Sequence, residues 1–441
     1  MGRRSKDITD FVKDLIAIED IETKKRIYKK ILAITYKQGI YPSSIHDFYS
    51  ARGRGELSGF TAPAINLRSM TYDLARAIFR VAIRNNSGAF IFEIAKSEMG
   101  YTAQPPCEYS AVILAAAIKE EYRGPVFIQA DHTQVNLKKF KEAPEEEMDY
   151  LKALIEEAVE FGFYNIDIDS STLVDLTQAT VKKQQELNFE TCAKLTQFIR
   201  RIEPRGITIS VGGEIGEVGH KNSTAEELRV FMEGFKERLR KGLAGISKIS
   251  VQTGTSHGGV VLADGSIAQA ALDFDTLKIL SWLARSEYGL SGAVQHGAST
   301  LPSEAFHKFA ECETAEVHLA TEFQNMIYDS RHFPQELKEK IYQWLKVNAA
   351  SERKIGETDE QFFYKTRKKA LGPFKREIIG LADSLRDAIA AEIEVKFEFL
   401  FKQLNVINKK ELVDKYVSLK RVISRKRKQG AAVAHDGQGA D

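Results

Sequence analysis

The stretch VFIQADHTQV, residues 126–135, places an apolar run directly before Asp131 and His132. A continuous apolar run is typical of a strand in a parallel sheet, because helices cover both faces of the sheet and bury the strand completely. An acid and a histidine at the end of such a strand form either a hydrogen-bonded structural pair or part of a site. The pattern in the rest of the chain decides between the two interpretations.

Similar short apolar runs alternate with longer amphipathic stretches from Phe60 to about Asp329. The eight runs are residues 61–67, 89–95, 125–131, 163–169, 207–214, 247–253, 291–296 and 315–320. This alternation predicts an α/β fold of repeated strand and helix units over a parallel sheet. Eight units over about 270 residues match a (β/α)8 TIM barrel. A doubly wound open sheet is the alternative, but no G-x-G-x-x-G follows the first strand.

Helical periodicity continues on both sides of the predicted barrel. We expect an N-terminal helical extension over residues 1–58, a TIM-barrel catalytic domain over 59–330, a C-terminal helical extension over 331–428 and a flexible tail over 429–441. The C-terminal helices are amphipathic, so their apolar faces need a partner. That partner is either the barrel's own surface or a second subunit.

Composition argues against several classes of function. The chain has 63 basic and 61 acidic residues, so its net charge of +2 gives no global field that favours nucleic acid or an anionic membrane. We expect no membrane partner and a cytoplasmic location, because neither a signal-peptide core nor an uncharged run of spanning length occurs. Cys107, Cys192 and Cys312 are too widely spaced for a C-x-x-C pair and are predicted to be buried thiols.

Polar residues with metal-binding chemistry follow four of the predicted strands. Asp131 and His132 end the third run, Glu214 ends the fifth, His257 lies just past the sixth, and His296 ends the seventh. Barrel enzymes carry their chemistry at these carboxyl ends. Imidazole nitrogens and carboxylates suit zinc or a similar divalent ion. One histidine at a strand end is more often structural, but this many candidates at equivalent ends predict a metal site on one rim.

Glycine-rich segments accompany these candidates: GGEIGEVG at 212–219, GTSHGG at 254–259 and HGAS at 296–299. Glycine lets backbone amides approach an oxyanion closely, so these segments favour a phosphate site. Tight barrel turns explain each segment equally well when it is taken alone.

Together, the motifs resemble the class II, metal-dependent fructose-bisphosphate and tagatose-bisphosphate aldolases over about residues 60–330. QADHT looks like that family's strand-end motif, which implies that Asp131 is the catalytic base and His132 a metal ligand. Glu214 in GEIG, His257 in GTSHG and His296 in QHGAS fall on its other ligand positions.

The resemblance implies further expectations about ligands and assembly. The substrate would be a sugar phosphate, the cofactor Zn²⁺ or another divalent metal together with a monovalent cation, and the assembly a homo-oligomer. The residues expected to bind substrate or its phosphate are Asn66, Gly258, Gly297, Ser299, His318 and Thr321.

The chain also departs from the family's pattern. VHLATE stands where the family reads V-N-I-D-T-D, so His318 replaces an asparagine and Ala320 an aspartate. Ala95 takes the place of a serine that helps bind phosphate. The loop after GGEIGEVG is expected to carry a glutamate used in proton exchange. Here it continues as HKNSTAEEL, whose glutamates, Glu226 and Glu227, come only at its end, where a helix is expected to begin.

Three hypotheses therefore stay open. The first is a metal-dependent aldolase that cleaves or forms the C3–C4 bond of a ketose phosphate or bisphosphate, giving dihydroxyacetone phosphate and an aldehyde. The second is a metal-dependent ketose epimerase on the same scaffold, suggested by His318 and the missing loop glutamate. The third is a noncatalytic aldolase partner subunit, suggested by the helical extensions and opposed by the intact candidate ligands.

Overall fold

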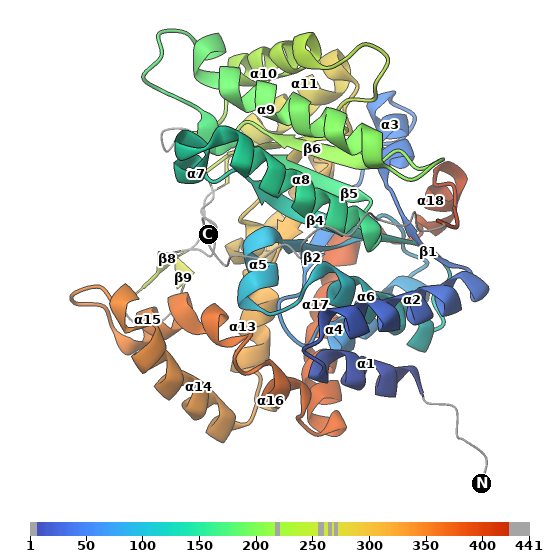
Figure 1. The fold of residues 1–441 in the computed structure, drawn as a ribbon, viewed down its shortest axis with the longest axis vertical. Coiled ribbons are helices and arrows are strands. Elements are labelled where there is room, and N and C mark those ends of the chain that lie inside the picture. Colours follow the sequence, from blue (N-terminus) through green and yellow to red (C-terminus); the bar gives the residue numbers. More distant parts are fainter. Residues whose placement is uncertain (1–6, 217–220, 255–259, 263–266, 269–271, 423–441) are drawn as a thin grey trace.

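The computed structural model describes residues 7–216, 221–254, 260–262, 267–268 and 272–422, and its centre is a closed barrel of eight parallel strands (Figure 1). In chain order the barrel strands are β2 (Ala62–Asn66), β3 (Ile91–Ala95), β4 (Gly124–Gln134), β5 (Asn165–Asp169), β6 (Ser210–Glu214), β7 (Lys248–Val251), β10 (Ala293–Gln295) and β11 (Glu316–Leu319). The pairing of β11 with β2 and of β4 with β5 closes the ring. The predicted TIM barrel is confirmed, because each strand coincides with one of the eight apolar runs.

Helices surround the barrel because most of the stretches between the runs bury an apolar face on it. They are α4 (Thr71–Arg84), α5 (Lys96–Tyr101), α6 (Pro106–Lys119), α7 (Leu137–Glu142), α8 (Pro144–Glu160), α9 (Val181–Ile202), α10 (Ala225–Arg238), α11 (Phe274–Tyr288), α12 (His307–Glu311) and α13 (Thr321–Asp329). A separate antiparallel pair joins β8 (Val260–Val261) to β9 (Ile267–Ala268). Among the described helices, none combines the length and the apolar character needed to cross a membrane.

The N-terminal segment contains a strand that periodicity did not reveal. It folds into α1 (Ile8–Ala17), α2 (Ile21–Lys37), β1 (Ile40–Ser43) and α3 (His46–Gly53). β1 pairs in parallel with Gly124–Phe127, the first part of β4. The Asn165 side chain joins β1 to the barrel by donating to the carbonyls of Ser43 and Ile128. Four residues including a proline carry no alternation signal, so only the long-range pairing makes this segment a strand.

A β-bulge in β4 changes the direction of its side chains at the mouth of the barrel. The register between β4 and β5 shifts between Ala130 and Thr133, and His132 has a φ of 39°. In a regular strand, consecutive side chains point to opposite faces. Bulges interrupt this alternation and re-aim side chains. Both Asp131 and His132 consequently line the same cavity.

The C-terminal helices pack on the barrel of the same chain. They are α14 (Gln335–Asn348), α15 (Asp359–Thr366), α16 (Lys375–Ile379), α17 (Asp383–Gln403) and α18 (Lys410–Tyr416). α17 lies against α4, where Glu394 accepts from Arg80 at 2.6 Å. The ring of Phe401, on α17, also lies 5.4 Å from that of Phe90, just before β3. The barrel's own surface is therefore a partner of the amphipathic C-terminal helices, the first of the two possibilities that their sequence left open.

Charged side chains fill part of the barrel interior. The Lys248 ammonium, on β7, lies 2.9 Å from a carboxylate oxygen of Asp167 and 2.5 Å from one of Glu316. It also donates to the Gln129 amide oxygen at 2.7 Å. Lys248 and Glu316 are almost completely buried, so their charges depend on one another for solvation.

We predict that Lys248→Met lowers the free energy of unfolding by about 3–5 kcal/mol, because it leaves buried carboxylates without their cation. Urea unfolding followed by circular dichroism measures the change. Lys182→Met is the control, since Lys182 forms only an exposed ion pair with Glu237 and its removal should change stability by less than about 1 kcal/mol. Equal stability of the two variants would contradict the importance of the buried cluster.

Candidate active site

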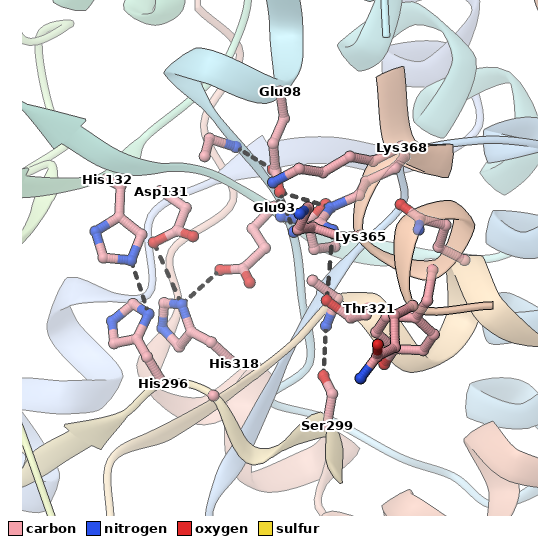
Figure 2. Close-up of a pocket in the computed structure, with 18 of the residues that line it drawn as sticks. Glu93, Glu98, Asp131, His132, His296, Ser299, His318, Thr321, Lys365 and Lys368 are labelled. Carbon is pink, nitrogen blue, oxygen red and sulfur yellow. Dashed lines mark hydrogen bonds and ion pairs between the residues drawn. The ribbon is translucent and has the colours of Figure 1, made fainter. Parts of the chain in front are cut away.

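The carboxyl ends of the barrel strands open into a cavity of about 520 Å³. Its walls come from the barrel strands, from the loops that follow them and from the C-terminal extension between Lys354 and Lys368. Figure 2 shows two groups of side chains: imidazoles and carboxylates on one side, and lysines with hydroxyl groups on the other.

The first group brings two predicted ligands into direct contact. Nε2 of His132 is 3.0 Å from Nδ1 of His296. Nδ1 of His132 is 3.2 Å from a carboxylate oxygen of Asp169 and 3.5 Å from one of Glu214. The other ring nitrogen of His296 is 3.1 Å from the Ser250 hydroxyl. The four titratable groups come from β4, β5, β6 and the end of β10, so closure of the barrel assembles them.

Electrostatics in this cluster favour a bound cation. Burial and the neighbouring Asp169 carboxylate raise the pKa of Glu214 to about 8. Burial alone would lower the pKa of His132, but the carboxylates of Asp131 and Glu214 raise it well above its usual range. Carboxylates crowded around imidazoles in a buried place are a nitrogen and oxygen donor set that suits zinc. The residues present therefore fit the divalent metal that the sequence led us to expect.

A second group lies beside the first and contains Asp131. Nδ1 of His318 is 3.3 Å from Asp131 and 3.0 Å from Glu93 (Figure 2). Its Nε2 is 3.0 Å from Glu316. Burial opposes ionisation of Asp131, but His132 and His318 hold its pKa well below the usual range. Burial raises the pKa of Glu93 to about 7, against the effect of His318. Asp131 is consequently an ionised acceptor on the floor of the cavity.

A buried carboxylate fixes the part of the wall formed by β2 and its loop. Glu98, on α5, accepts from the Ala95 amide at 2.7 Å and from the Asn66 side-chain amide. It also accepts from Arg68, with nitrogen to oxygen distances of 2.7 and 2.6 Å. The three donors end or follow β2 and β3, so Glu98 holds both strand ends in one arrangement.

The structure places most of the predicted site residues around this cavity. The predicted residues that line it are Asn66, Asp131, His132, His296, Gly297, Ser299, His318 and Thr321. Glu214 reaches the same place through its contact with His132. His257 and Gly258 lie outside the described residues.

Departures from the expected pattern have structural consequences. Ala320 brings no carboxylate to the cavity, and its amide donates to the Ser299 hydroxyl at 3.1 Å. Glu227 lies in the first turn of α10 and accepts from the Thr224 amide at 2.8 Å. It forms a capping box with Thr224, so it stabilises the start of a helix.

Several residues that line the cavity or contact its lining were not predicted from the sequence. Asp169 ends a predicted strand, so the criterion used for Glu214 would have found it. Glu93 lies inside its strand and Glu98 just after it, and neither has a motif. Lys365 and Lys368 belong to helices far along the chain, and only the packing of the extension brings them to the mouth.

Comparison with known proteins identifies the family of the chain. The family model of class-II fructose-bisphosphate aldolases matches residues 54–377. The chain belongs to this family. The match continues beyond the barrel into α16, so the family's region includes α14 and α15 as well as the barrel. No curated protein sequence matches the chain significantly.

Solved structures share the fold at low sequence identity. A protein from Sinorhizobium meliloti 1021, described as a "probable tagatose 6 phosphate kinase", has a TM-score of 0.55 and 14% identity, with 81% of this chain and 99% of that chain covered. Fructose-bisphosphate aldolase from Campylobacter jejuni has a TM-score of 0.48 and 17% identity, covering 84% and 97%. The YdjI aldolase from Escherichia coli K12 has a TM-score of 0.46 and 13% identity, covering 83% and 98%. At these identities the first likeness shows the fold alone.

We predict that Asp169→Asn weakens zinc binding about 10- to 100-fold, because Asp169 fixes the ring of His132 by contact with Nδ1. Competition with a chromogenic chelator measures the affinity. Asp175→Asn is the matched control, since Asp175 accepts only local bonds from Thr177 and Gln178. Unchanged affinity in the Asp169 variant would remove that residue from the metal site.

Proposed function

We propose that the protein is a metal-dependent class II aldolase that cleaves or forms the C3–C4 bond of a ketose phosphate or bisphosphate, giving dihydroxyacetone phosphate and an aldehyde. The observation that carries the proposal is the β4 bulge, which directs Asp131 and His132 into one cavity with His296. The family match supports the same class of reaction.

Binding of the metal is assigned to side chains from several strands. His132, His257 and His296 would hold Zn²⁺ or another divalent cation, with Glu214 as a further ligand. When bound, the cation would polarise the ketone and stabilise the enediolate as a Lewis acid. Each ligand must be deprotonated, so binding is coupled to proton release from the imidazoles. A monovalent cation beside it stays an expectation from the family resemblance.

Asp131 is proposed as the general base. The barrel holds it ionised beside His318, so it can take the proton from the C4 hydroxyl as the C3–C4 bond breaks. His318 stands where the family has an asparagine, and its ring would orient the carboxylate that receives this proton. Asn66, Gly297, Ser299 and Thr321 would contact the substrate or its phosphate, as would Gly258.

We predict that Asp131→Asn lowers kcat/KM by about 10²- to 10⁴-fold while bound zinc stays near the wild-type stoichiometry, because the base is not a ligand. Turnover and elemental analysis of the same preparation check both parts. His132→Ala is the comparison, since removal of a ligand should reduce the metal content as well. Retained turnover in the Asp131 variant would exclude it as the base.

The experiment that tests the function uses zinc-loaded protein with fructose and tagatose 1,6-bisphosphates. Release of dihydroxyacetone phosphate is measured beside a sample treated with chelator. Chelator-sensitive release would establish aldol cleavage, and the relative rates would give the preferred configuration at C4. Failure to hold a divalent metal would favour a noncatalytic partner subunit.

Epimerisation of a ketose is a second candidate, supported by a specific observation. His318 and Asp131 form a pair of acid and base groups on the cavity floor, 3.3 Å apart. Such a pair can exchange a proton at a carbon next to a ketone. Interconversion of ketose epimers without release of dihydroxyacetone phosphate would favour this activity over cleavage. A homo-oligomeric assembly and a cytoplasmic location stay predictions from the sequence.

A further inference from the structure

The side of the cavity away from the candidate metal ligands is rich in cations. The C-terminal extension contributes three lysines to the lining, and the loop after β2 contributes an arginine. The four cations are Lys354, Lys365, Lys368 and Arg68, and the carboxylates among the lining residues near them are Glu98 and Glu357. Figure 2 shows Lys365 and Lys368 opposite His132 and His296.

The lysines belong to a segment that is anchored to the barrel. Lys365, on α15, donates to the Glu352 carbonyl at 3.0 Å and to Glu357 at 2.7 Å. Two residues further along, the buried Arg367 pairs with Asp329 of α13 at 3.1 Å. These contacts fix the backbone that carries Lys365 and Lys368, so the ammonium groups have defined approaches to the cavity.

Arg68 approaches from the barrel and is equally fixed. Its guanidinium is bound by the buried Glu98 and lies 3.5 Å from the Thr321 hydroxyl. Ser299 supplies a second hydroxyl to this side. Ala320, which directly follows β11, has no carboxylate, although the family pattern led us to expect an aspartate there. This position therefore adds no negative charge beside Arg68 and the lysines. Cations and hydroxyls therefore converge from two separate parts of the chain.

We propose that Lys365 and Lys368 of the C-terminal extension, together with Arg68, bind a phosphate ester of the substrate. A phosphate dianion accepts charge-assisted hydrogen bonds from several directions, which suits donors that enter from opposite walls. The inference rests on the proposed function, since it concerns the substrate of that site. According to this inference, the C-terminal extension forms the phosphate-binding wall of the cavity and contributes to the choice of substrate.

The test uses the full-length, zinc-loaded protein and binding by calorimetry. Inorganic phosphate, dihydroxyacetone phosphate, unphosphorylated dihydroxyacetone and acetate are titrated into the wild type and into Lys365→Met, Lys368→Met and the double variant. We expect each lysine substitution to weaken binding of both phosphate compounds about 10-fold or more, because a hydrogen bond to a charged group is lost. Binding of dihydroxyacetone should stay unchanged.

Lys369→Met is the matched control. Lys369 is next to Lys368 in the chain, pairs with Glu352 and does not line the cavity. This variant should bind phosphate as the wild type does. If it weakens binding as much as the other two variants, the effect is general charge and the assigned site is wrong.

The remaining outcomes separate this inference from the proposed function. Phosphate affinity that does not depend on Lys365 and Lys368 overturns the inference, even if the wild type cleaves a ketose bisphosphate. Equal lysine-dependent binding of acetate and phosphate also overturns it, because the site would then recognise any anion. Lysine-dependent phosphate binding without aldol cleavage would support phosphate binding by the extension and count against the aldolase function.

Discussion

The arrangement of the cavity depends on the bulge in β4. A regular strand would direct Asp131 and His132 to opposite faces, and only one of them would reach the mouth. The register shift against β5 and the positive φ of His132 bring both into the same cavity. Such a backbone conformation costs about 1–3 kcal/mol and persists only where its surroundings impose it. Pairing of β4 with β3, β5 and β1 provides that support.

Carboxylates cluster inside the barrel and at its mouth, and their mutual repulsion has to be offset by cations. Six carboxylates from five strands lie inside the barrel or at its mouth, on Glu93, Asp131, Asp167, Asp169, Glu214 and Glu316. Beneath the cavity, Lys248 pairs with Asp167 and Glu316. His318 connects this ion cluster to the cavity floor through its contact with Glu316. Imidazoles occupy the upper part, where a divalent cation would complete the charge balance. The buried ion pairs of Lys248 and the side chains proposed for catalysis therefore belong to one continuous polar network.

The two helical extensions lie at different places relative to the cavity. The N-terminal segment adds β1 beside the start of β4, at the end of the barrel away from the site. The C-terminal segment folds back on the barrel, with α17 on α4, and places residues 354–368 at the mouth. The extension therefore forms part of the cavity wall, whereas the candidate ligands lie on the barrel strands.

The eight barrel strands, the helices between them and the strand-end positions of Asp131, His132, Glu214 and His296 could all be predicted from the amino-acid sequence. This was possible because burial imposes an apolar run on each strand, and parallel strands end on the same rim. Other features emerged only from the folded chain: the pairing of β1, the bulge at His132, the contacts of Glu93 and Glu98, and the position of Lys365 and Lys368 at the cavity. These features depend on contacts between residues far apart in the chain, which leave no local periodicity to read.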